Sequence, residues 1–166
     1  MQGIYKAYAP YHYHGVVQQL VVQLKFGMVE DAAQPLASAM AECVQHSSFD
    51  ALVPVPLSKN RLRERGFNQA ALLANMLAER NGSTVLNALR RVRNTHGQSA
   101  ILSALRRERN VADAFEAVVP VQGLRLLLVD DVRTTGATAR ACADALLNTG
   151  AKEVSLLTAA IAPPRK

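Results

Sequence analysis

The chain has 166 residues, of which 49% are hydrophobic, and this length allows one well-buried domain but not two independent cores. Its apolar runs are shorter than the ~20 residues of a bilayer-spanning helix, and its tyrosine-containing N-terminus does not resemble a signal peptide, so we expect a cytoplasmic protein without membrane insertion. Cys43 and Cys142 are the only cysteines, which excludes a disulfide framework and a Cys-x-x-Cys zinc site and indicates core-facing thiols.

The net charge of +6 is concentrated in two short segments. Lys59, Arg61, Arg63 and Arg65 form the first, and six arginines between residues 90 and 109 belong to the second. Local basicity of this kind attracts polyanions. A pyrophosphate-bearing substrate and a nucleic acid are both compatible with it.

Apolar residues at helical spacing predict two helices in the first third of the chain. The first contains Val16, Leu20 and Leu24 on one face, the second covers Val29–Val44, and a break is expected at residues 25–28. A strand over Ala51–Val55 follows, and its prolines place it at a sheet edge or a strand end.

The rest of the chain predicts alternating helices and strands. After a basic loop or short turn we expect a helix over 67–80, a weaker strand over 85–89, a polar loop over 90–110 with a short helix at 101–107, a strand over 114–119, a strand over 124–129, a helix over 137–147 and a strand over 154–161 that closes the sheet. This alternation predicts an α/β fold with a parallel or mostly parallel sheet.

Val129–Thr138 is the most informative stretch and reads Val-Asp-Asp-Val-Arg-Thr-Thr-Gly-Ala-Thr. It joins a strand buried on both faces to a hydroxyl-rich glycine turn and a helix. Ligands of open α/β sheets bind at the carboxyl ends of strands, and the first N–H groups of a helix can bind phosphate. Asp130 and Asp131 offer acceptors for ribose hydroxyls, while the threonines offer donors for a phosphate. A strand-to-helix turn with a simple threonine cap is the alternative.

This stretch resembles the loop that binds 5-phosphoribosyl 1-pyrophosphate (PRPP) in type I phosphoribosyltransferases. A second segment, Val53–Gln69, contains Pro-Val-Pro-Leu and Arg-Gly-Phe-Asn-Gln and is similar to the ComF-type, competence-associated branch of that superfamily. The resemblance covers nearly the whole chain. It implies a type I phosphoribosyltransferase fold, in which helices flank a central, mostly parallel sheet, as a single domain over residues 1–166 with a small helical hood in residues 1–48. The four-cysteine zinc element that many ComF-type proteins carry is absent from this sequence, so its roles are not transferred.

The resemblance also implies roles for individual residues. Asp130 and Asp131 would be catalytic, and the 5′-phosphate loop would comprise Arg133, Thr134, Thr135, Gly136, Ala137 and Thr138. The pyrophosphate loop would include Pro56, Leu57, Ser58 and Lys59, flanked by Arg61 and Arg65, whose guanidinium groups suit bidentate phosphate binding. A flexible lid would carry Arg91, Thr95, Gln98, Arg106 and Asn110. The alternatives are a solvated basic helix start for the first basic segment and an exposed hairpin or helix pair for the second.

The implied activity is transfer of the 5-phosphoribosyl group from PRPP to a nitrogen nucleophile, with a nucleobase as the favoured acceptor and pyrophosphate as the product. Mg²⁺ would be the cofactor, held through PRPP and by Asp130 and Asp131 rather than by a protein ligand cluster. A non-catalytic PRPP sensor, or a competence protein that binds single-stranded DNA or partner proteins, is the alternative. Few aromatic residues lie near the arginines, which argues against base stacking.

Overall fold

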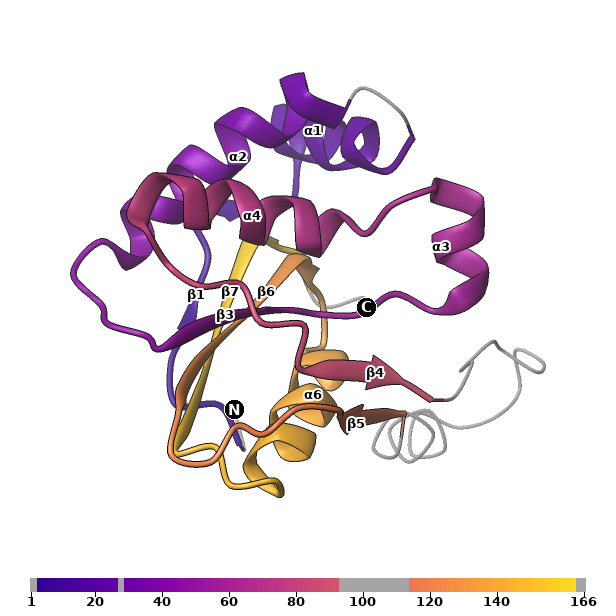
Figure 1. Ribbon diagram of the computed structural model, residues 1–166. Coiled ribbons are helices and arrows are strands. Elements are labelled where there is room, and N and C mark those ends of the chain that lie inside the picture. Colours follow the sequence, from indigo (N-terminus) through magenta and orange to yellow (C-terminus); the bar gives the residue numbers. More distant parts are fainter. Residues whose placement is uncertain (1–2, 27–28, 93–113, 164–166) are drawn as a thin grey trace.

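The computed structural model describes residues 3–26, 29–92 and 114–163, and it is organised around one parallel sheet (Figure 1). The strands follow the order β1-β7-β6-β3, with β2 also paired to β7. Their bounds are Ala7–Tyr8 for β1, Tyr11–His12 for β2, Ala51–Pro54 for β3, Arg125–Arg133 for β6 and Glu153–Ile161 for β7. Every pairing in this sheet is parallel, which confirms the predicted α/β class.

The last strand is an inner strand of the sheet, so the prediction that it closes the sheet is wrong. β6 pairs along one edge of β7, and β1 and β2 pair along the other, with Ala7 opposite Leu156 and Tyr11 opposite Ala160. The two short strands come from the tyrosine-containing N-terminal segment. Each is only two residues long, which is too short for a periodic sequence signal.

Helices cover both faces of the sheet (Figure 1). The helices α1 (Gly15–Phe26), α2 (Val29–Val44) and α4 (Gln69–Asn81) lie on one side, and α6 (Ala137–Leu147) lies on the other. Their positions confirm the predicted helices. Val21 and Leu24 of α1 are buried as expected, whereas Val16 in the first turn of α1 is 69% exposed.

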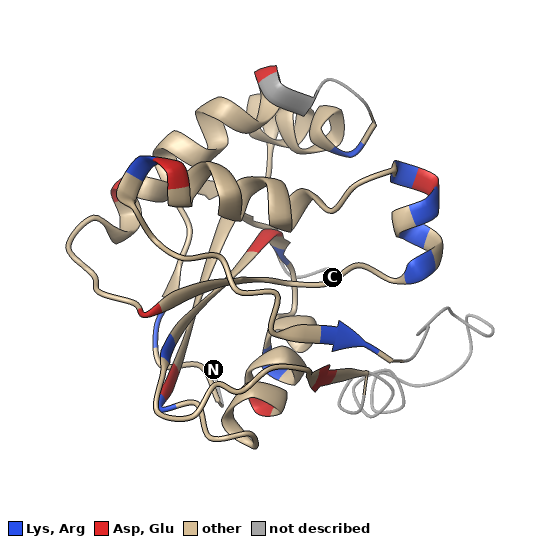
Figure 2. Ribbon diagram, in the orientation of Figure 1, with Lys and Arg blue, Asp and Glu red and all other residues tan. Residues whose placement is uncertain are grey.

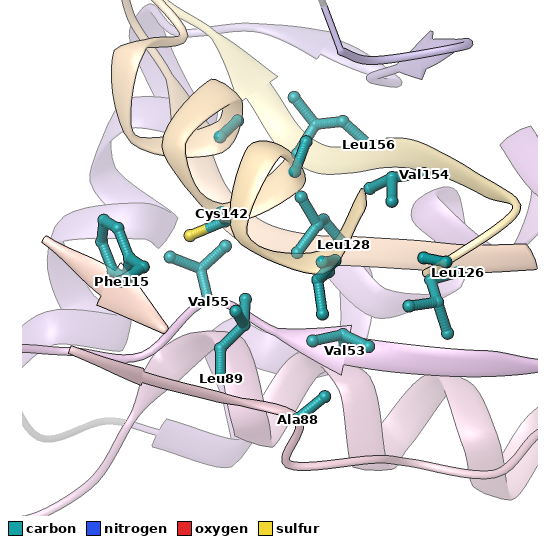
Figure 3. Close-up of a cluster of buried hydrophobic side chains, with 14 of the residues drawn as sticks. Val53, Val55, Ala88, Leu89, Phe115, Leu126, Leu128, Cys142, Val154 and Leu156 are labelled. Carbon is teal, nitrogen blue, oxygen red and sulfur yellow. The ribbon is translucent and has the colours of Figure 1, made fainter. Parts of the chain in front are cut away.

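Alternate residues of β6 supply the two cores. Leu127 and Val129 pack with α2 and α4, while Leu126 and Leu128 pack with Val53, Leu156 and Cys142 on the α6 side (Figure 3). A strand buried on both faces needs apolar residues at every position, which explains the continuous run that precedes the acidic pair. The deeply buried thiol of Cys142 is a core residue, as predicted.

Two short antiparallel strands form a small sheet that is separate from the main sheet. It consists of β4 (Leu89–Arg91) and β5 (Phe115–Ala117), and Arg90 pairs with Glu116 across it. The strand predicted at 85–89 is therefore misplaced: Val85 makes an isolated bridge to Leu52 on the edge of β3, and β4 begins at Leu89. The helix predicted at 101–107 lies outside the described residues. No helix in the described part of the chain is long and apolar enough to cross a bilayer.

Candidate functional site

A cavity of about 520 Å³ lies at the carboxyl-terminal edge of the sheet. Residues of three parallel strands, or just after them, line it: Val55 and Pro56 after β3, Asp130 and Asp131 within β6, and Ala162 after β7. A smaller cavity of about 50 Å³ lies beside it, at the turn between β6 and α6. Asp130, Thr134 and Thr138 line both cavities, so the two spaces adjoin.

The acidic pair lies inside β6 rather than after it. Pairing with β7 continues from Asp130 opposite Thr158 to Arg133 opposite Ile161, so the strand does not end at Val129 as predicted. The backbone partners across the ladder outweigh the low strand propensity of two aspartates. Because side chains alternate along a strand, Asp130 and Asp131 lie on opposite faces of the sheet.

Asp130 keeps its proton to an unusually high pH. Burial, followed by the negative charge of Asp131, raises the pKa of the Asp130 carboxyl to about 8. Its Oδ1 accepts a hydrogen bond of 2.9 Å from the backbone N–H of Asp131. Near neutral pH, therefore, this carboxyl is neutral and can donate a hydrogen bond as well as accept one.

Asp131 has a different environment, because both of its oxygens are engaged. Oδ1 accepts from the backbone N–H of Val132 at 2.7 Å, and Oδ2 lies 3.0 Å from Nζ of Lys25 at the end of α1. The side chain of Lys25 is only 22% exposed, and that of Asp131 is only 15% exposed. Lys25 also lines the larger cavity. No motif in the sequence points to a role for Lys25, although it is the only charged residue of α1.

The turn after β6 lines the small cavity. All six residues of the expected 5′-phosphate loop contribute: Arg133, Thr134, Thr135, Gly136, Ala137 and Thr138. Gly136 has φ 77°, a left-handed conformation that glycine adopts without strain, and it begins α6 without a side-chain cap. Thr135 Oγ1 accepts from the N–H of Ala137 at 3.3 Å. The hydrogen bond of a threonine at the helix start, which is the alternative interpretation of this turn, therefore occurs at a residue that also lines the cavity.

A short helix, α3 (Lys59–Arg65), replaces the basic loop or turn predicted after β3. Ser58 begins it by accepting from the N–H of Arg61 at 3.3 Å, and Gly66 ends it with φ 79°. Arg61 and Arg65, four residues apart, both line the larger cavity, as do Pro56 and Leu57. Ser58 is buried as a helix cap, and Lys59 is exposed on α3 outside the cavity lining. Blue stretches of the ribbon mark the Lys and Arg residues of α3 and β4 (Figure 2).

Arg91 of β4 brings a third guanidinium to the same end of the cavity. Burial, and then the positive charge of Arg61, lower the pKa of Arg91. Its guanidinium lies 5.3 Å from the centre of the Phe115 ring. Like charges held together at a cavity wall favour an anionic ligand. The other expected lid residues, Thr95, Gln98, Arg106 and Asn110, lie outside the described residues.

The start of α4 adds two polar residues that had no assigned role. Asn68 accepts from the N–H of Ala70 at 3.1 Å and donates Nδ2 to the carbonyl of Val55 at 3.0 Å. Gln69 is 2% exposed, and its Oε1 accepts from Nη1 of Arg65 at 3.0 Å. Among the described residues, Nε2 of Gln69 has no hydrogen-bond partner. Both residues line the larger cavity, and both belong to the Arg-Gly-Phe-Asn-Gln segment that carries the resemblance to ComF-type proteins.

Within the described ranges, no group of three or more His, Cys, Asp and Glu side chains could hold a metal ion. One ionised carboxylate and one neutral carboxyl suit an ion that binds mainly through water and phosphate oxygens, which is the habit of Mg²⁺.

Together, the parallel sheet, the acidic pair and the glycine-threonine turn define a type I phosphoribosyltransferase fold. A solved glutamine PRPP amidotransferase from B. subtilis, complexed with ADP and GMP, superposes with a TM-score of 0.50 and 27% identity over 77% of this chain and 26% of that chain. The chain belongs to the ComF-type family. DNA utilization protein YhgH of Salmonella typhi is 40% identical over 82% of this chain, and competence protein F of Haemophilus influenzae is 36% identical over 85% of it.

The chain spans 63% and 64% of the lengths of these two curated relatives, respectively. No family model matches the sequence. The curated relatives establish the family of this chain, and the solved structure supports its fold.

Proposed function

We propose that this chain binds PRPP and transfers its 5-phosphoribosyl group to a nitrogen nucleophile, with a nucleobase as the favoured class of acceptor and pyrophosphate as the product. The adjoining cavities carry this proposal. The glycine-threonine turn lines the smaller cavity, Asp130 lines both cavities, and Asp131 and three arginines line the larger one. This distribution supports placing the 5′-phosphate, the ribose and the pyrophosphate of PRPP in that order. The name of the similar amidotransferase contains the term PRPP, which agrees with this proposal.

The small cavity would take the 5′-phosphate, because Thr134, Thr135 and Thr138 offer hydroxyls there and α6 begins there. The ribose would lie against Asp130 and Asp131. The pyrophosphate would lie against Arg61, Arg65 and Arg91, where guanidinium groups can bind phosphate oxygens in pairs. Among the residues that we proposed from sequence, Ser58 would act by starting α3 and Lys59 would remain outside the contact.

Catalysis would be electrostatic, because positive charge develops on the ribose while negative charge develops on the departing pyrophosphate. The ionised carboxylate of Asp131 would stabilise the first charge, and the arginines would stabilise the second. Neutral Asp130 could donate a hydrogen bond to a ribose oxygen. Mg²⁺ bound with PRPP would neutralise part of the pyrophosphate charge, and Asp131 is the residue best suited to contact it directly or through water.

Isothermal titration of PRPP with Mg²⁺ tests the binding step. We expect Asp131→Asn and Thr135→Val to weaken binding, since they remove an acceptor and a donor from the proposed site. Asp31→Asn and Thr84→Val are matched controls at exposed positions outside both cavities and should bind as the unmodified protein does. Absence of binding at millimolar PRPP would contradict the proposal.

Release of pyrophosphate across a panel of purines and pyrimidines tests the transfer step. Turnover that depends on Asp131 supports an enzyme. PRPP binding without turnover on any nitrogen acceptor would favour a sensor of the same fold.

A second candidate function is the binding of single-stranded DNA or of competence proteins. Lys59 and Arg63 favour it, because they are exposed on α3 outside the cavity and give the protein a basic surface that PRPP would not occupy. Binding should then fall steeply with salt. Lys59→Ala with Arg63→Ala should weaken DNA binding without changing PRPP affinity; equal loss of both would contradict a separate surface.

A further inference from the structure

The larger cavity has two ends of different chemistry. Arg61, Arg65 and Arg91 line the end nearest β3. The other end lies at the carboxyl ends of β6 and β7, where Val132, Ala162 and Pro163 meet side chains of the N-terminal region: Tyr13, Gln18 and Lys25. We call this second part, defined by these six residues, the α1 end of the cavity. The acidic pair separates the two ends.

The α1 end is positioned for the acceptor. A nucleophile approaches C1 of the ribose from the side opposite to the departing pyrophosphate, and the arginines take the pyrophosphate to the β3 end. Tyr13 is fixed beside β7, since its backbone N–H donates to the carbonyl of Ile161 at 2.8 Å. Gln18 and Lys25 are seven residues apart in α1 and therefore lie on the same face, two turns apart.

Among the residues that the structure describes, Lys25 is the only cation lining the α1 end, and its bound partner is a group that the substrate needs. Oδ1 of Asp131 accepts from the backbone and Oδ2 faces Lys25, so a ribose hydroxyl that binds this carboxylate shares its lone pairs with Lys25. The ion pair is then weakened, although the side chain of Lys25 is only 22% exposed. A largely buried charge with a weakened partner favours another anion at this end.

We propose that the acceptor itself supplies this anion: it is a nitrogen heterocycle that carries a carboxylate or an equivalent anionic oxygen, and Lys25 binds that group after release from Asp131. The inference rests on the proposed transfer function and names the substrate class of the same site. Lys25 is then a specificity-determining residue, and its counter-ion changes from Asp131 to the acceptor as the complex assembles.

The transfer balances as a substitution at C1. The lone pair of the acceptor nitrogen forms the new C1–N bond, and the C1–O bond to pyrophosphate breaks with its electron pair leaving on the pyrophosphate oxygen. A proton carried by the nitrogen passes to water. The carboxylate is unchanged by the reaction and serves only to orient the ring through Lys25.

Paired acceptors test the proposal: a pyridine carboxylate with its carboxamide, and a pyrimidine carboxylate with the unsubstituted ring. With PRPP and Mg²⁺, pyrophosphate release should favour the acid of a pair by about tenfold or more in kcat/KM, as expected for a charge-assisted contact. Lys25→Met should abolish this preference, and Lys25→Arg should retain most of it. Lys152→Met, an exposed lysine outside the cavity, is the matched control and should retain it fully.

The outcomes separate this inference from the proposed function. If neutral rings are turned over and Lys25→Met shows the same preference between acid and neutral ring as the unmodified protein, the inference is overturned. The proposed transferase function then still stands. If PRPP binds but no acceptor reacts, calorimetric binding of the same acids and amides to protein saturated with ribose 5-phosphate decides: equal affinities overturn it. If PRPP does not bind, both fall.

Discussion

Asp130 and Asp131 are consecutive in β6, yet they lie on opposite faces of the sheet and differ in charge near neutral pH. Asp131 is paired with Lys25 of α1, whereas burial and the charge of Asp131 keep the neighbouring carboxyl protonated. The strand thus presents one anion and one neutral donor at adjacent positions. The same two residues can therefore contact a ribose without placing two negative charges together.

The first prediction concerns the pH dependence of stability. The folded protein keeps the Asp130 proton up to about pH 8, while an unfolded chain releases it near the ordinary pKa of about 3.9. The folded state therefore binds more protons between these values, and the contribution of this group to stability falls as the pH rises. Urea unfolding at pH 5 and pH 8 should show this loss in the unmodified protein and a smaller loss in Asp130→Asn.

Asp50 provides a control with the opposite sign. The backbone N–H and then the side chain of Arg125 lower the pKa of Asp50, so its contribution is present above the ordinary pKa and disappears only in acid. Asp50→Asn should keep the loss of stability between pH 5 and pH 8. An unchanged pH slope in Asp130→Asn would contradict the raised pKa.

The second prediction concerns Gly136, which has φ 77° at the start of α6. Gly136→Ala should lower the free energy of unfolding by about 1 kcal/mol, because a side chain disfavours this conformation. It should also weaken PRPP binding, since the turn forms the small cavity. Gly82→Ala is the matched control: φ is 70° and a Cβ there meets open space. A similar stability loss with unchanged PRPP affinity is expected for it, measured by urea unfolding and calorimetry.

The third prediction separates Arg61 and Arg63, two of the three arginines of α3, by their orientation. Arg61 lines the cavity near Arg91, whereas Arg63 does not line it. Arg61→Ala should reduce pyrophosphate affinity about tenfold, as expected for loss of a charge-assisted bond. Without ligand, the same variant should be slightly more stable, because a like-charge repulsion is removed. Arg63→Ala should leave pyrophosphate affinity unchanged; a comparable loss in both variants would indicate only a general effect of charge.

The fourth prediction concerns Gln69, which holds Arg65 at the cavity wall through a bond of 3.0 Å. Gln69→Leu should leave the free energy of unfolding within about 1 kcal/mol of the unmodified value, because the change removes a bond and also a buried donor, Nε2, that has no partner in the part of the chain the structure describes. Pyrophosphate affinity should nevertheless fall several-fold as Arg65 loses its anchor. Gln34→Leu, at an exposed position of α2, controls for the added apolar surface. Unchanged affinity in Gln69→Leu would show that Arg65 needs no such support.

The sequence predicts the local parts of this site better than its long-range pairs. Val129–Thr138 contains the end of the apolar strand, the two acids and the glycine turn in one segment. Because these residues are neighbours in the sequence, their proximity in the structure is predictable from the sequence alone. Arg61 and Arg65 are four residues apart, a spacing that places them on one face if the segment is helical, and the Ser58 cap starts that helix.

Contacts between distant segments have no comparable signal in one sequence. Lys25 and Asp131 meet because α1 lies over the end of β6, and helical periodicity does not contain that information. The same holds for β1 and β2, whose partner β7 is separated from them by most of the chain. Lys59 shows another limit, since membership in a basic segment does not distinguish the cavity face of α3 from its outer face, where Lys59 lies exposed.

The inner position of β7 has a consequence for biosynthesis. Among the described strands, β7 leaves the ribosome last, yet β1, β2 and β6 all pair with it directly. The N-terminal strands must therefore wait, with their backbone groups bonded to water, until nearly all of the described chain has been translated. The sheet is completed in a late, nonlocal step, which favours slow folding and leaves the early strands dependent on protection against wrong pairing in the meantime.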